Sequence, residues 1–138
     1  MKNEELYSMF RQFGNFLINN GSAIFPDDEI AQVELAFTEF EDRDSRVTFS
    51  GRHIAVNNSA IIIFDVNQDE ILKTRIDKTG KIIKVSKKFQ PETQETEEEI
   101  SYVVSELTLT LANGECVNFL RPSDGDMALI FDQFAKLY

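Results

Sequence analysis

The amino-acid sequence predicts an α+β fold with about seven short antiparallel strands between an N-terminal and a C-terminal amphipathic helix. Apolar residues recur with helical spacing in residues 1–20 and again in 123–138, whereas apolar and polar residues alternate through much of 31–120. Asn, Gly and Asp separate the alternating segments, and these residues favour tight turns between antiparallel strands. The strands would form either a partly open β-barrel or two packed sheets.

The first expected element is a single helix over residues 3–19. Its apolar residues form one helical stripe, made of Leu6, Met9, Phe10, Phe13, Phe16 and Leu17. Asn3 is a suitable N-cap, because its side chain can accept a hydrogen bond from a free N–H group of the first turn. Asn19, Asn20 and Gly21 follow, and these residue types end helices because they adopt the left-handed conformation readily.

Strands are expected from about residue 31 onward. In the first half of the chain they are residues 33–37, 46–50, 54–56 and 60–66. Gly51 is expected to mark a bulge or a sharp bend between two of them. The last segment is a continuous apolar, largely β-branched run, which is typical of a strand in the middle of a sheet.

A basic hairpin is expected next. Residues 70–76 and 81–87 should pair across a turn at 77–80, and Gly80 would close that turn. Residues 90–99 lack periodicity and contain several acids, which predicts a solvated loop.

The clearest hairpin lies near the C-terminus. Leu107, Leu109 and Leu111 alternate with threonines, Val117 and Phe119 lie on the far side of Asn113-Gly114, and Asn-Gly is a strong hairpin signal. The final helix should be capped by Ser123, with Asp126 three residues later as in a capping box. Its apolar stripe consists of Met127, Ile130, Phe131, Phe134, Leu137 and Tyr138.

Length and composition predict one domain spanning residues 1–138, since 138 residues is close to the commonest domain size. The only cysteine, Cys116, excludes an intramolecular disulfide and a thiolate metal cluster. Acidic Glu4 and Glu5 lie where a signal peptide carries basic residues, and the longest apolar run, 60–64, is far too short to span a membrane. A cytoplasmic location is therefore expected.

The sequence contains no recognisable catalytic or metal-binding arrangement. Asp65, Asn67 and Asp69 have the spacing that opens a calcium loop, but Glu70 stands where that loop needs Gly, so a polar hairpin turn is expected. His53 is the only histidine and has no neighbouring nucleophile. We therefore expect no enzyme activity, no cofactor and no metal.

The charge of the chain is unevenly distributed. The net charge is −10, which disfavours general nucleic-acid binding because binding to phosphates depends on basic residues. Residues 73–88 contain seven of the fourteen basic residues and one acid, Asp77, so this segment carries +6 and the rest of the chain −16. An acidic run at residues 92–99 follows directly.

This basic segment is the candidate binding site. If Leu72, Thr74, Ile76, Ile83 and Val85 face inward, the cationic side chains of both strands face outward. The predicted binding residues are Lys73, Arg75, Lys78, Lys81, Lys84 and Lys88. The alternative is that a lysine-rich face merely prevents an exposed hairpin from pairing edge to edge with another chain.

The order of elements from Ala31 to Tyr138 resembles the pleckstrin-homology-like architecture. The resemblance covers ELTLTLANGECVNFL and the capped segment SDGDMALIFDQFAKLY that ends the chain. In that family two nearly orthogonal sheets form a partly open barrel, and the terminal helix plugs one end. The family's frequent Trp in that helix is missing here, so Phe131 or Phe134 would fill its space. Lipid-binding members carry their basic residues in the first hairpin, whereas this chain has them in a later one; the resemblance therefore assigns no binding residues.

Two functions are consistent with these features. The first is a non-catalytic binding or adaptor domain that engages a protein or an anionic ligand through the basic hairpin or a sheet edge. The alternative is a small acidic inhibitor or immunity-type protein that blocks a basic partner, because its negative charge would steer association. The oligomeric state stays open, since any uncovered strand edge could pair.

Overall fold

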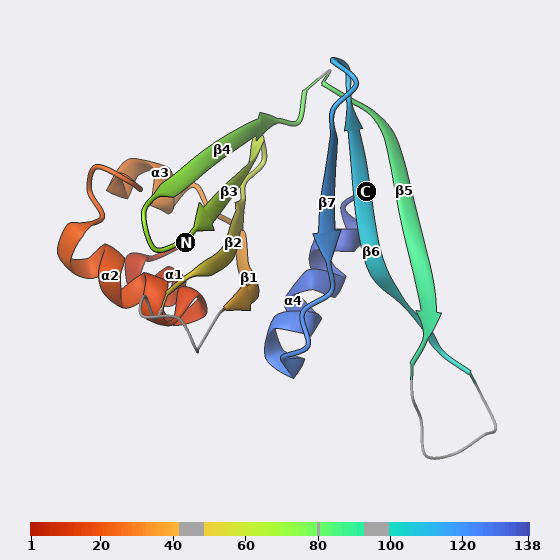
Figure 1. Ribbon diagram of the computed structural model, residues 1–138, viewed down its shortest axis with the longest axis horizontal. Helices are drawn as coiled ribbons and strands as arrows, with labels where there is room; N and C mark the ends of the chain where they lie inside the picture. Colours follow the sequence, from red (N-terminus) through yellow and green to blue (C-terminus); the bar gives the residue numbers. More distant parts are fainter. Residues whose placement is uncertain (42–48, 80, 93–99) are drawn as a thin grey trace. The chain divides into compact units, whose positions relative to one another are not determined.

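The structure is a computed structural model that describes residues 1–41, 49–79, 81–92 and 100–138 (Figure 1). It contains two compact units, Met1–Thr79 and Gly80–Tyr138, and each is considered by itself. The described residues form one four-stranded and one three-stranded antiparallel sheet, with helices before the first sheet and after the second. This confirms the predicted α+β fold class and its seven strands. That the chain folds as a single domain stays a prediction.

The first unit contains the four-stranded sheet. Its strands are β1 (Leu35–Glu41), β2 (Gly51–Val56), β3 (Ala60–Val66) and β4 (Ile71–Asp77), in the spatial order β1-β2-β3-β4. β3 lies between β2 and β4 and is buried at every residue except Asp65, which confirms the expected central strand. The strand expected at 46–50 is not found in its described part, because Phe49 and Ser50 only lead into β2; residues 46–48 lie outside the described residues.

Asparagine side chains close two hairpins of this sheet. Asn57 Oδ1 accepts hydrogen bonds from the backbone N–H groups of Ser59 and Ala60, each at 2.8 Å. Asn67 Oδ1 accepts from the N–H groups of Asp69 at 2.9 Å and Glu70 at 3.0 Å. The Asn67 oxygen is therefore occupied by its own turn, as expected for a polar hairpin.

The N-terminal segment folds differently from the single helix expected over residues 3–19. It forms α1 (Asn3–Phe10) and α2 (Gln12–Asn20), and a third helix, α3 (Asp27–Ala31), follows. The expectation of one continuous helix was wrong because the chain breaks at Arg11, whose backbone has φ 54° and ψ −117°. The expected Asn3 cap was also wrong: Lys2 occupies the N-cap position, and the Asn3 side chain donates to Asp27 Oδ1 at 2.7 Å.

Gly14 permits the two helices to approach each other closely. A Cβ atom at Gly14 would lie 2.0 Å from the Tyr7 carbonyl oxygen, well inside any real contact distance. In a continuous helix, residues seven apart are separated by about 10 Å along the axis. The break at Arg11 therefore brings α2 back onto α1, and both helices cover one face of the sheet (Figure 1).

The core beneath these helices is apolar and rich in phenylalanine. Its buried members are Leu6, Phe10, Phe13, Leu17, Phe25, Ile30, Val33, Ala36, Ala55, Ile62, Phe64 and Val66. Phe13 and Phe64 lie with their ring centroids 5.4 Å apart, which joins α2 to the central strand. The apolar stripe predicted from helical spacing therefore faces the sheet, although it is divided between two helices.

The second unit contains the three-stranded sheet and the C-terminal helix. Its strands are β5 (Ile82–Pro91), β6 (Tyr102–Leu111) and β7 (Cys116–Leu120), in that spatial order, and they are followed by α4 (Gly125–Lys136). The Asn113-Gly114 hairpin is confirmed, with Leu107 opposite Phe119 and Gly114 at φ 89°. The Phe119 and Phe134 rings lie 5.1 Å apart, so α4 packs against this hairpin.

Two expectations for this part of the chain were wrong. The N-cap of α4 is Asp124 and not Ser123, because the Asp124 side chain accepts hydrogen bonds from the N–H groups of Asp126 and Met127. β5 continues to Pro91, where the loop 90–99 was expected to have begun; residues 93–99 of that loop lie outside the described residues.

The predicted hairpin of residues 70–76 and 81–87 does not form. β4 pairs with β3 and β5 pairs with β6, and the two strands belong to different sheets. The turn residue expected at Gly80 lies outside the described residues. Each strand pairs instead with a neighbour of matching alternation, such as Val85 of β5 opposite the buried Leu109 of β6. The described helices include none long and apolar enough to cross a membrane.

Candidate functional site

The six predicted binding residues are divided between the two units. Lys73 and Arg75 lie on β4 and Lys78 directly follows it, whereas Lys84 and Lys88 lie on β5 and Lys81 directly precedes it. The cationic face expected from both strands of one hairpin is therefore not formed.

Lys73 holds helix α3 against the edge of the first sheet. Its ammonium group donates to Glu29 Oε1 at 2.5 Å and to the carbonyl oxygen of Ile24 at 3.0 Å. It also lies 5.3 Å from the ring centroid of Phe25 and 5.7 Å from that of Phe64, which favours a cation–π interaction. The expectation that Lys73 faces away from the core was wrong, because in the register it lies opposite the buried Phe64.

Arg75 and Lys78 also interact within their own unit. Arg75 Nε lies 3.3 Å from Asp77 Oδ1, and both side chains are about half exposed. Burial lowers the pKa of Lys78, and the nearby charge of Glu34 opposes this shift. We therefore look to β5 for a basic surface that is directed toward a partner.

On β5 the alternation of side chains follows the prediction. Lys84 and Lys88 lie on the face of the sheet that also carries Thr110 and Glu106, opposite the face of Val85. Lys88 Nζ lies 3.2 Å from Glu106 Oε2. The pKa of Glu106 is lowered first by the hydrogen bond that Asn118 donates to it and then by Lys88. This face is therefore a polar, exposed surface with lysines along one edge.

The backbone of β5 is open along the edge that faces away from β6. On β6, the backbone groups of Ser105 and Leu111 form hydrogen bonds on the side of β7. Because these directions alternate along a strand, the N–H and C=O groups of Glu106, Thr108 and Thr110 point toward β5. Their partners in β5 are Lys84, Ser86 and Lys88. Val85 and Lys87 lie between these partners and therefore direct their N–H and C=O groups away from β6. No described strand pairs with that edge, which Figure 1 shows as the outer side of β5.

Large apolar side chains are exposed along the same strand. Ile83 is 66%, Val85 39% and Phe89 57% exposed, although Val85 lies on the same face of the sheet as the buried Leu109. Pro91 ends the strand, and proline inside a strand is typical of sheet edges because it has no N–H to donate. The lysines of β5 and Pro91 were the sequence features that could have identified this segment as an edge strand.

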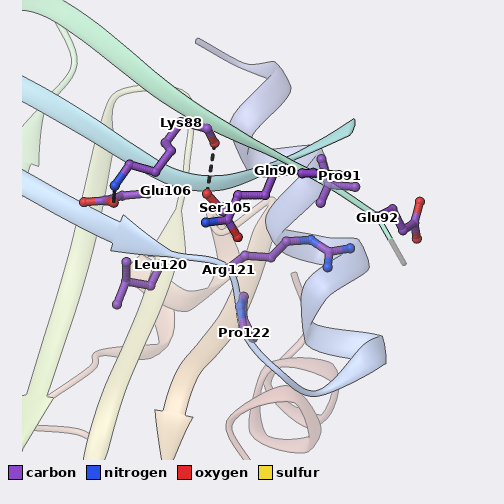
Figure 2. Close-up of a pocket in the computed structure, with 10 residues that line it drawn as sticks. Lys88, Gln90, Pro91, Glu92, Ser105, Glu106, Leu120, Arg121 and Pro122 are labelled. Atoms are coloured by element: carbon purple, nitrogen blue, oxygen red, sulfur yellow. Dashed lines mark hydrogen bonds and ion pairs between the residues drawn. The ribbon is translucent and has the colours of Figure 1, made fainter. Parts of the chain in front are cut away.

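A polar pocket of about 500 Å³ lies at the Pro91 end of this sheet (Figure 2). It is lined by Lys88, Gln90, Pro91, Glu92, Val103, Ser105, Glu106, Leu120, Arg121 and Pro122. Its two cations have acidic partners, since Lys88 pairs with Glu106 and Arg121 donates to both Asp132 oxygens at 3.1 and 3.2 Å. The hydrogen bond to Asp132 is the main cause that raises the pKa of Arg121. Both cations of this pocket are therefore paired with acids of the chain itself.

His53 lies in the core of the first unit. Its Nδ1 accepts from Thr38 Oγ1 at 2.9 Å, and its Nε2 donates to the Phe49 carbonyl oxygen at 3.0 Å. The imidazole stacks on Phe13 with 4.5 Å between ring centroids and is fully buried. Burial lowers its pKa to about 4, so the ring is neutral at pH 7 and both nitrogens are engaged in structural hydrogen bonds.

Cys116 and Asp65 lie in different units and contact different partners. Cys116 is exposed, with its Sγ 3.6 Å from Thr110 Oγ1. Asp65 Oδ1 lies 3.5 Å from Arg52 Nε. Within the described residues, no group of three or more His, Cys, Asp or Glu side chains is arranged to hold a metal ion.

Comparison of the chain with protein-family models, curated proteins and solved structures yields no match. The functional interpretation therefore depends on the geometry of the molecule itself.

Proposed function

We propose that this chain is a non-catalytic binding or adaptor domain that engages a partner protein by adding a strand to the open edge of β5. The observation that carries this proposal is the outward direction of the backbone polar groups of Val85 and Lys87 on a ten-residue edge strand. An extended peptide can pair with such an edge through main-chain hydrogen bonds, and its alternate side chains then contact the flanking surface.

The lysines of β5 favour an acidic partner. From Lys78 to Pro91 the chain contains five lysines and no acid. Lys84 is exposed beside the open edge, whereas Lys88 pairs with Glu106 on the same face of the sheet. Opposite charge on the partner would speed association and disfavour basic competitors. The rest of the chain is strongly acidic, so an acidic segment would be repelled from most of the surface and attracted to this strand.

We also propose the pleckstrin-homology-like fold and a cytoplasmic location. The fold is supported by a four-stranded and a three-stranded antiparallel sheet followed by a capped C-terminal helix. The location is supported by the single cysteine of the chain.

The test selects ten-residue peptides that bind the whole chain from a random library. The affinity of the selected peptides is then compared between two variants of Lys87. Lys87→Pro removes the outward N–H and the charge, whereas Lys87→Gln removes only the charge. We expect the selected peptides to be acidic with alternating apolar residues. Their affinity should fall at least about ten-fold more in Lys87→Pro than in Lys87→Gln, because each lost main-chain hydrogen bond weakens the added strand.

Val85→Pro, at the other outward-facing position, provides the same test if Lys87→Pro fails to fold. Equal binding by the proline and glutamine variants would contradict strand addition. If the selected peptides are basic and Lys84→Glu does not change their affinity, the proposal is wrong. That result would support the alternative, an acidic inhibitor that blocks a basic partner.

A further inference from the structure

A small cleft with apolar and charged residues lies beside the open edge of β5, between the strands of the second sheet and α4. Its volume is about 330 Å³, and its lining residues are Lys87, Phe89, Tyr102, Val103, Val104, Asp132, Ala135 and Lys136. All of them belong to the second unit. The cleft is therefore formed by β5, β6 and α4 of this unit alone, and α4 contacts β6 there.

The lining of the cleft includes two aromatic and three aliphatic residues beside its charged ones. Phe89 pairs in register with Val104, and Tyr102 pairs with Pro91, so both aromatic side chains lie at the same end of the two strands. Phe89 is 57% and Tyr102 is 61% exposed. Exposed aromatic rings next to a cleft are common at binding sites, because they offer a large contact area and favour edge-to-face contacts with a second ring.

The charged residues at the rim favour an acidic neighbour. Lys87 lies on β5 and Lys136 in the last turn of α4. The one acid of the lining, Asp132, accepts two hydrogen bonds from the Arg121 guanidinium, so its charge is compensated. The remaining charge at the cleft is therefore positive.

Lys87 connects the cleft with the open edge. It lines the cleft and is also one of the two residues whose backbone groups point away from β6. A strand that pairs beside Lys87 would therefore place one of its side chains at the cleft. With a volume near the lower end of the usual range for ligand sites, about 300–1,000 Å³, the cleft suits a single large side chain better than a cofactor.

We infer that the segment bound by β5 carries an aromatic residue next to an acid, and that the aromatic side chain enters the cleft formed by Phe89, Tyr102 and Ala135. This inference rests on the proposed strand addition. The occupant is an acidic segment of another protein. A second copy of this chain fits less well, because pairing β5 with β5 would bring Lys84, Lys87 and Lys88 against their own equivalents.

The test uses two synthetic ten-residue peptides in which Glu and Thr alternate. The two peptides differ only at one central residue, which is Phe in the first and Ala in the second. Binding to the whole chain is measured by calorimetry, and the site by amide chemical shifts. We expect the Phe peptide to bind at least ten-fold more tightly than the Ala peptide. Phe89→Ala and Tyr102→Ala should each remove most of that difference, and Lys136→Glu should weaken the Phe peptide.

The matched controls are Leu129→Ala, an exposed apolar residue of α4 outside the cleft, and Lys2→Glu, an exposed lysine of the first unit. Both should leave binding unchanged. Equal binding of the two peptides, with both lost in Lys87→Pro, would overturn the aromatic anchor and leave strand addition intact. Binding of the Phe peptide that is unaffected by Lys87→Pro would overturn strand addition. Self-association through β5 that the Phe peptide does not reverse would overturn both.

Discussion

Lowering the pH from 8 to 5 should remove about 2 kcal/mol from the free energy of unfolding through His53 alone. The imidazole is fully buried, and desolvation lowers its pKa to about 4 although its hydrogen bond to Phe49 opposes the shift. In the unfolded chain the pKa returns to about 6.5. The unfolded state therefore takes up the proton first as the pH falls. This contribution to stability is fully present above pH 6.5 and is lost progressively between about pH 6.5 and pH 4.

The magnitude follows from the difference between these two pKa values. One pKa unit corresponds to about 1.4 kcal/mol. At pH 5 the unfolded imidazole is almost fully protonated while the folded one is mostly neutral, which gives the loss of about 2 kcal/mol; at pH 4 the loss rises to about 3 kcal/mol. Such a loss is a large part of the stability of a small domain.

The assay is urea unfolding at several pH values between 5 and 8, for the natural chain and for His53→Gln. Because His53 is the only histidine, the variant should lose about 2 kcal/mol less than the natural chain between pH 8 and pH 5, whatever its absolute stability. The imidazole pKa can be read directly from its NMR titration. A folded-state pKa near 6.5, or an unchanged pH dependence in the variant, would refute the reasoning.

The remaining predictions concern three glycines. A methyl group added at Gly114 or at Gly125 would meet open space, but of these two only Gly114 has a positive φ, 89°. Gly114→Ala should therefore lower the free energy of unfolding by about 1 kcal/mol, whereas Gly125→Ala, at the start of α4, should raise it by about 0.5 kcal/mol. Urea midpoints measure both, and a change of the same sign at the two positions would contradict the argument from backbone conformation. Gly14→Ala should destabilise the protein by about 1–3 kcal/mol in the same measurement, because its Cβ would lie 2.0 Å from the Tyr7 carbonyl oxygen; a stabilised variant would show that α1 and α2 do not approach in this way.

Elements whose information is local could be predicted from the sequence. The Asn113-Gly114 hairpin, the strand Ala60–Val66 and the final helix all appear close to their expected positions. The break at Arg11 could not be predicted, because the apolar spacing continues unchanged across it. The break brings Gly14 against Tyr7, a contact that only the folded chain contains and that requires a residue without a Cβ atom at position 14.

The candidate site was predicted only in part. Lysine density pointed to residues 73–88, and Lys84 and Lys88 do lie on an exposed edge strand. Lys73 has the same residue type and a similar sequence environment, yet its ammonium group is bound by Glu29, a residue more than forty positions away. Charge patterning identifies basic segments, but it does not show which cations the folded chain uses itself.

The sequence by itself determined the fold class, because helical spacing, strand alternation and turn residues each depend on neighbours within a few positions. The tertiary structure decided how strands pair. A strand can form a ladder with any other strand of suitable alternation. β5 pairs with β6, which follows it in the sequence, rather than with β4, which precedes it. That choice divides the predicted basic hairpin, and it turns the backbone of Val85 and Lys87 into the open edge on which the proposed function depends.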